Sequence, residues 1–167
     1  MRVLVTAASR HGATHEIAEA IAAGLERRGV QTEVRRAEEL TTLDGYDAYV
    51  IGSAVYIGRW LDRARELVEA HTEPLASRPV WLFSSGPLGP PENLKPEGDP
   101  VDVDALVAAT AAVEHRVFAG RLDRKLLSFP EKALVVAVRA PEGDFRDWQA
   151  IDEFAAGIAT WLHTQPH

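Results

Sequence analysis

The sequence predicts a doubly wound α/β fold, in which helices cover both faces of a five-stranded parallel sheet. Short apolar runs of strand length alternate along the chain with segments whose apolar residues recur at helical spacing. Three of the runs end in loops rich in glycine, serine or proline, and these loops follow Val5, Ile51 and Phe83. Ligands of doubly wound sheets bind outside the carboxyl ends of the strands, at the switch point of the strand order. We therefore expect the three loops to converge on one crevice.

The composition is that of an ordinary globular protein, and we expect residues 1–167 to form a single domain. A net charge of −7 argues against nucleic acid as the main partner, because phosphate backbones select basic surfaces. The chain has no cysteine, which excludes disulfides, thiol catalysis, iron–sulfur clusters and thiolate zinc sites. Signal-peptide and transmembrane patterns are also lacking, so we expect a cytoplasmic protein.

The first strand, the first helix and the loop between them form the most informative stretch. An apolar run ends at Val5, a loop of small and hydroxyl residues follows, and helical spacing begins at Ile17. The unpaired amides and the dipole of a helix N-terminus attract anions such as phosphate. Hydroxyl groups can add hydrogen bonds, and a glycine lets the backbone approach the anion closely. The predicted phosphate loop consists of Ser9, Arg10, His11, Gly12, Ala13 and Thr14.

The middle of the chain predicts two strands and a helix. Gly29 ends the first helix. Residues 30–36 alternate in polarity as an edge strand does, and 37–44 suit a short helix or loop. Residues 47–52 are apolar enough for a buried strand. Helical spacing then resumes with Leu61, Ala64, Leu67 and Val68.

The second half predicts two more strands and two more helices. Residues 79–84 and 115–120 are short apolar strands. Between them, Asp99-Pro100 is expected to cap a helix. The last helix begins near Trp148, and its apolar face is expected to bury Ile151, Phe154, Ile158 and Leu162.

Segment 121–147 is longer than a minimal connection between the last strand and the last helix. Its residues 128–131 match a capping box, which favours a helix, although the β-branched residues of 132–139 also suit a strand. We prefer a helix that docks on another surface. A peripheral membrane contact, a partner chain, a second copy in a homodimer and the domain's own body all remain open as its target.

The phosphate loop resembles that of flavodoxins, which consists of Ser or Thr, two residues, Gly, one residue and Thr. It lacks the lysine of a P-loop and the three glycines of a dinucleotide fingerprint, which argues against ATP and NAD. Stretches 47–56, 118–122 and 143–148 further resemble the flavodoxin-like branch that includes menaquinone-dependent protoporphyrinogen dehydrogenase. The resemblance implies a flavodoxin-like sheet with strand order 2-1-3-4-5 and noncovalently bound FMN.

The resemblance also implies that the FMN phosphate binds the first loop and that the flavin ring lies between the second and third loops. A flavin ring needs flat apolar contact and backbone amides facing its carbonyl groups. Tyr56 is the expected ring-facing aromatic, whereas Trp60 is at least as well explained by packing in the core. One side of the ring would be lined by Ala54, Val55, Tyr56, Ile57 and Gly58. The other side would be lined by Ser84, Ser85, Gly86 and Pro87.

The leading functional hypothesis is an FMN-dependent oxidoreductase that passes electrons to a redox partner or to a quinone-like or porphyrinogen-like small molecule. No catalytic residue is assigned and no metal is expected, because neither an acid–base pattern nor metal-ligand spacing is present. An electron-carrier flavodoxin without its own substrate is the close alternative. Ala7, where flavodoxins usually carry an aromatic residue, and the proline-rich third loop favour a flavin-free interaction domain. A deazaflavin in place of FMN also remains open.

Overall fold

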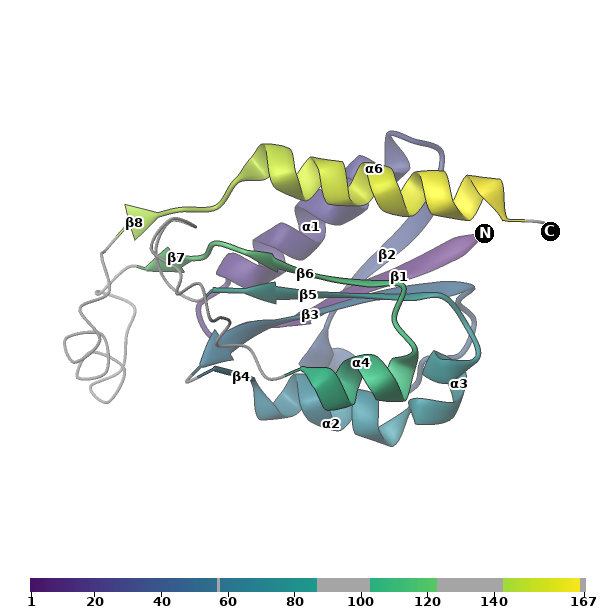
Figure 1. Ribbon diagram of the computed structural model, residues 1–167, viewed down its shortest axis with the longest axis horizontal. Helices are drawn as coiled ribbons and strands as arrows, with labels where there is room; N and C mark the ends of the chain where they lie inside the picture. Colours follow the sequence, from purple (N-terminus) through teal and green to yellow (C-terminus); the bar gives the residue numbers. More distant parts are fainter. Residues whose placement is uncertain (57, 87–102, 123–142, 166–167) are drawn as a thin grey trace.

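The computed structural model describes residues 1–56, 58–86, 103–122 and 143–165, and its centre is a parallel sheet with strand order β2-β1-β3-β5-β6 (Figure 1). All four pairings along this order are parallel. The strands are β1 (Arg2–Ala8), β2 (Gln31–Arg36), β3 (Ala48–Tyr56), β5 (Val80–Ser85) and β6 (Glu114–Phe118). Numbered among these five alone, the order is 2-1-3-4-5, so the predicted fold is confirmed.

Helices cover both faces of this sheet, as predicted (Figure 1). One face carries α1 (Ala13–Glu26) and α6 (Trp148–Thr164). The other carries α2 (Asp62–Ala70), α3 (Thr72–Ala76) and α4 (Asp104–Thr110). A short 3₁₀ helix, η1 (Ala37–Glu39), follows β2. Within the described part of the chain, no helix combines the length and apolar character needed to cross a bilayer.

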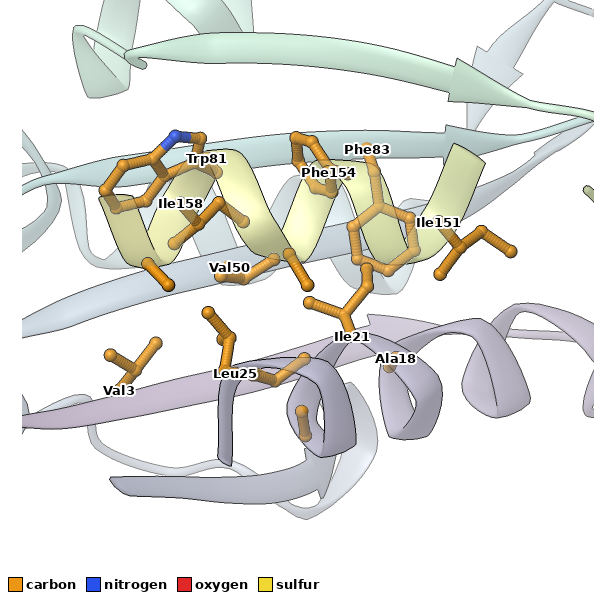
Figure 2. Close-up of a cluster of buried hydrophobic side chains, with 14 of the residues drawn as sticks. Val3, Ala18, Ile21, Leu25, Val50, Trp81, Phe83, Ile151, Phe154 and Ile158 are labelled. Atoms are coloured by element: carbon orange, nitrogen blue, oxygen red, sulfur yellow. The ribbon is translucent and has the colours of Figure 1, made fainter. Parts of the chain in front are cut away.

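The first hydrophobic cluster lies between α1, α6 and the sheet (Figure 2). Ile21 and Leu25 of α1 are 0% exposed and pack with Phe154 and Ile158 of α6, which the sequence pattern had predicted to be buried. The two helices approach closely at Gly24, where a Cβ atom would lie 2.8 Å from the Cβ of Ala155. Helical spacing of apolar residues therefore gave the correct buried face of both helices.

A second cluster lies on the opposite face of the sheet, against α2, α3 and α4. Successive strand residues point to opposite faces, so Leu4 belongs to this cluster while its neighbours Val3 and Val5 belong to the first. This double burial explains why the central strands β1, β3 and β5 contain continuous apolar runs, whereas the edge strand β2 alternates in polarity. Phe83 of β5 lies across Gly52 of β3, where a Cβ atom would lie 2.2 Å from the phenyl Cζ.

Four details of the described residues differ from the sequence prediction or extend it. A two-residue strand, β4 (Arg59–Trp60), pairs antiparallel with the end of β3, and α3 follows α2 directly. Helix α4 begins at Asp104 with Val103 in the cap position; the expected cap at residues 99–100 lies outside the described residues. Strands β7 (Arg121–Leu122) and β8 (Gly143–Asp144) form a separate antiparallel pair. The helix predicted near 128–139 also lies outside the described residues.

Candidate functional site

The predicted phosphate loop connects β1 to α1 at the carboxyl edge of the sheet (Figure 1). The Ser9 hydroxyl accepts a hydrogen bond from the Gly12 amide at 3.0 Å, which closes the loop. Gly12 has a φ of +87°, a conformation that favours glycine, and its carbonyl accepts the first bond of α1 from the amide of Glu16. A Cβ at Gly12 would have no heavy atom within 4 Å, so the loop borders open space at this point. These features suit an anion at the first turn of α1.

The remaining loop residues differ in their exposure. Thr14 is only 2% exposed, whereas Arg10 is exposed and His11 and Ala13 are half-buried. The guanidinium of Arg10 lies 4.6 Å from the ring centroid of Tyr56 at the end of β3. This cation–π contact joins the first predicted loop to the second.

The second predicted loop is largely a β-hairpin. Ala54, Val55 and Tyr56 continue β3, and Val55 and Tyr56 pair with Trp60 and Arg59 of β4. The strand therefore ends four residues later than the sequence predicted, because β5 pairs with Ser53 and Ala54, and β4 supplies partners for Val55 and Tyr56 that a simple loop would lack. Gly58 has a φ of +71°, as the turn of this hairpin requires. Ile57 lies outside the described residues.

Two serine hydroxyls bond to Trp60 and Leu61, where the second strand of this hairpin ends. Ser53 and Ser84 are register partners on β3 and β5. Ser53 Oγ accepts a bond from the Leu61 amide at 3.0 Å, and Ser84 Oγ accepts one from Trp60 Nε1 at 2.8 Å. Trp60 is 2% exposed, so it packs in the core, the alternative that the sequence had offered for this residue. Ser84 is 0% exposed, and its hydroxyl is already bonded to Trp60 and His115, so the structure does not expose Ser84 to a ligand.

The half-buried His115 bonds to this serine, although no sequence pattern had marked it as a site residue. Its Nε2 lies 2.7 Å from Ser84 Oγ, so the serine hydroxyl stands between the histidine and the indole of Trp60. Burial lowers the pKa of His115, which favours the neutral ring. A neutral Nε2 can accept the Ser84 proton while the serine oxygen accepts the indole N–H. The residue pattern of the predicted strand 115–120 gives no indication that His115 contacts Ser84.

The third predicted loop begins beside the end of β6. Ser85 is 5% exposed, and Gly86 has a φ of +91° and donates its amide to the carbonyl of Phe118 at 2.9 Å. Gly120 allows this close approach, because a Cβ there would lie 3.3 Å from the Gly86 nitrogen. Pro87 lies outside the described residues.

Two arginines from the β7–β8 region contact the phosphate loop, and neither was predicted as a site residue. Arg121 donates to the carbonyl of His11 at 3.2 Å, and Arg146 donates to the carbonyl of Ala13 at 3.4 Å. Both guanidinium groups also lie near Glu16, at 3.6 and 3.4 Å respectively. The stretches 118–122 and 143–148 had drawn attention through the family resemblance, but the resemblance gave these arginines no role.

Arg146 is itself held firmly in place. Asp144 accepts two bonds from its guanidinium, at 2.8 and 2.6 Å, and the ring of Trp148 lies 4.6 Å away. The Arg146 side chain is 6% exposed. The charge pair lowers the pKa of Asp144 and raises that of Arg146, so both groups are ionised near neutral pH. In residues 1–56, 58–86, 103–122 and 143–165, no three His, Asp or Glu side chains are grouped so that they could hold a metal ion.

The fold and the loop geometry together define a flavodoxin-type protein. The sequence model of the flavodoxin domain family matches residues 4–149, and the chain belongs to that family. FMN is the cofactor of this family. Protoporphyrinogen IX dehydrogenase [quinone] of Escherichia coli K12 is 24% identical over 172 residues, which cover 95% of each protein.

Solved structures agree with this assignment of the fold. Flavodoxin 1 of Bacillus cereus matches with a TM-score of 0.64 and 16% identity, covering 99% of this chain and 100% of that one. An archaeal flavodoxin matches with a TM-score of 0.63 and 16% identity, covering 98% and 99%. The rubredoxin oxygen:oxidoreductase of Desulfovibrio gigas matches over 97% of this chain but 36% of its own length, with a TM-score of 0.61 and 11% identity.

Proposed function

We propose that the protein is an FMN-dependent oxidoreductase whose small-molecule redox partners are a quinone-like electron acceptor and a porphyrinogen-like electron donor. FMN, when bound, supplies the redox chemistry, and the protein supplies binding, orientation and electrostatics. The observation that carries the proposal is the contact between Arg10 and Tyr56, which joins the phosphate loop to the β3–β4 hairpin. These two segments follow adjacent strands, β1 and β3, at the carboxyl edge where ligands of this fold class bind.

The residues of the phosphate loop suit the phosphate end of FMN. Amides at the first turn of α1 can donate to phosphate oxygens, and open space borders Gly12. Thr14 can add its hydroxyl from a buried position. In this proposal the phosphate is held by Ser9, Arg10, His11, Gly12, Ala13 and Thr14.

The two following loops suit the flavin ring. Tyr56 offers a half-buried aromatic face at the end of β3. In this proposal one side of the ring is lined by Ala54, Val55, Tyr56, Ile57 and Gly58, and the other by Ser84, Ser85, Gly86 and Pro87. Neither Ile57 nor Pro87 is among the described residues, so their places in this lining rest on the sequence alone.

The choice of acceptor rests on the relative from Escherichia coli, whose name specifies protoporphyrinogen IX and a quinone. Its similarity extends over 95% of both chains, so the whole domain is comparable. A single domain, a cytoplasmic location and a redox partner belong to the same proposal. An electron carrier without its own substrate is the alternative, and it differs in needing a partner reductase for turnover.

The experiment has two steps. The purified protein is denatured, and the released cofactor is identified by absorbance and mass as FMN, FAD or a deazaflavin. The FMN-loaded protein is then assayed without oxygen in two ways. Protein reduced chemically is mixed with a soluble menaquinone analogue, and oxidised protein is mixed with protoporphyrinogen together with that quinone. Reoxidation of the reduced flavin by the quinone, or turnover of protoporphyrinogen with the quinone as electron acceptor, supports the oxidoreductase. Turnover only after a partner reductase is added favours the carrier, and failure to bind any flavin contradicts both.

A further inference from the structure

We propose that Arg121 and Arg146 are positioning residues of the cofactor site, which orient the amides of the phosphate loop by holding its carbonyl groups. The inference rests on the proposed function, because it assigns the loop to the FMN phosphate. Arg121 belongs to β7, and Arg146 follows β8 by two residues. If the inference is correct, this strand pair is part of the cofactor site (Figure 1).

Because the peptide bond is planar, a group that holds a carbonyl also orients the amide that follows it. The carbonyl of one residue and the amide of the next share a plane and point in nearly opposite directions. Arg121 holds the carbonyl of His11, and the amide in that plane belongs to Gly12, which donates to Ser9. Arg146 holds the carbonyl of Ala13, and the amide in that plane belongs to Thr14. Each guanidinium therefore fixes one peptide plane of the loop and aims its amide away from the β7–β8 pair.

Arg146 is buried within the protein and does not lie on its surface. Its side chain is 6% exposed, and Asp144 fixes its direction through two charge-assisted bonds. Phe145, between the two, donates its amide to the carbonyl of Gly120 at 3.0 Å, which ties β8 to the residue before β7. A buried guanidinium has five donors to satisfy: Asp144 accepts from Nε and Nη2, and the Ala13 carbonyl and Glu16 both accept from Nη1.

A purely electrostatic role of the two arginines and a role in orienting the loop predict different effects of mutation on phosphate binding. Two arginines, Arg121 and Arg146, face two carboxylates, Glu16 and Asp144, so the four side chains sum to a formal charge of zero. Removal of Asp144 takes away a negative charge near the loop, which should strengthen phosphate binding if only charge matters. If Arg146 must be held in place to orient the loop, the same removal should weaken phosphate binding.

The test compares FMN with riboflavin, which carries the same ring but no phosphate. Dissociation constants for both are measured by fluorescence titration with the full chain and with Arg121→Met, Arg146→Met and Asp144→Ala. We expect FMN binding to weaken about tenfold in each variant, the size expected for loss of a charge-assisted hydrogen bond, with riboflavin binding changed by less than about twofold. Arg27→Met is the matched control, because Arg27 pairs with Asp152 at the opposite end of α1.

Three results would overturn the inference. Equal weakening of FMN and riboflavin would indicate general damage to the fold, and unchanged FMN binding would remove the role of the arginines. Stronger FMN binding by Asp144→Ala would show that charge alone acts. Arg121 is 27% exposed, so its variant remains informative if Arg146→Met fails to fold.

A measurement without flavin separates this inference from the proposed function. Hydrogen exchange of the Gly12 and Thr14 amides is compared between the apo chain and Arg146→Met. Faster exchange at the Thr14 amide in the variant supports the positioning role even if the wild-type chain binds no FMN, an outcome that would contradict only the proposed function. Unchanged exchange there contradicts the inference.

Discussion

The indole N–H of Trp60 donates a hydrogen bond of 2.8 Å to the hydroxyl of Ser84, and both side chains are buried. Trp60 belongs to β4 and Ser84 to β5, so the bond ties the β3–β4 hairpin to the neighbouring strand. The hairpin carries Tyr56, which meets Arg10 of the phosphate loop. The buried bond therefore supports, from inside the protein, the segment that we assign to the flavin ring.

Replacement of Ser84 by alanine should destabilise the protein by about 1–3 kcal/mol, because the indole N–H of Trp60 and the Nε2 of His115 both lose a buried partner. Urea unfolding followed by circular dichroism measures the loss. Ser77→Ala is the control, since the Ser77 hydroxyl bonds to Pro74 at an exposed position. Equal small effects of both substitutions would show that the buried bond contributes little.

Stability should decrease as the pH falls below about 6.5, with His115 as one cause. Burial lowers the pKa of His115 in the folded protein, so the unfolded chain takes up a proton first as the pH falls. His115→Gln should reduce the slope of unfolding free energy against pH between about pH 5 and 7. An unchanged slope in the variant would contradict a buried neutral His115.

Replacement of Gly52 by alanine should destabilise the protein by about 1–3 kcal/mol or more, because the new Cβ would lie 2.2 Å from the ring of Phe83. Gly157→Ala in α6 is the matched control: its Cβ would meet no atom within 4 Å, and alanine favours the helix by up to about 1 kcal/mol. Thermal unfolding of both variants should therefore shift in opposite directions. A neutral Gly52→Ala would mean that Phe83 can move at little cost.

The ion pairs of Asp152 with Arg28 and Arg27 join α6 to α1, and hydrogen bonds from Arg28 lower the pKa of Asp152 to about 2. The resulting stabilisation is fully present above the ordinary carboxyl pKa near 3.8 and is lost as the pH falls through about 2. Asp152→Asn should thus lower the unfolding temperature at pH 7 but have a smaller effect near pH 2. An equal effect at both pH values would assign the loss to packing instead.

Local patterns predicted the fold well, because most of its determinants are local. Helical spacing of Ile151 and Phe154 predicted the buried face of α6, and apolar runs predicted the five parallel strands. Strand β4 was missed because two residues carry no periodicity. It is further held by hydrogen bonds from Leu61 to Ser53 of β3 and from Trp60 to Ser84 of β5, and the second partner lies 24 residues away in the sequence.

The site was less predictable than the fold, because part of it depends on contacts between residues that are distant in the sequence. Ser9 and Gly12 share a loop, so their role followed from a short motif, and the structure gives their hydrogen bond directly. Arg121 and Arg146 reach the loop from 110 and 133 residues away. No rule of composition or spacing predicts such contacts, so they are seen only in the folded structure.

The central claim is that the loop from Ser9 to Thr14 binds the phosphate of FMN. Titration of the apo protein with FMN, followed by tryptophan fluorescence, tests it most directly when wild type is compared with Thr14→Val and with the control Thr164→Val at the end of α6. We expect one FMN per chain, binding about tenfold weaker in Thr14→Val and unchanged in Thr164→Val. Absence of FMN binding by the wild type, or equal binding by all three proteins, would contradict the claim.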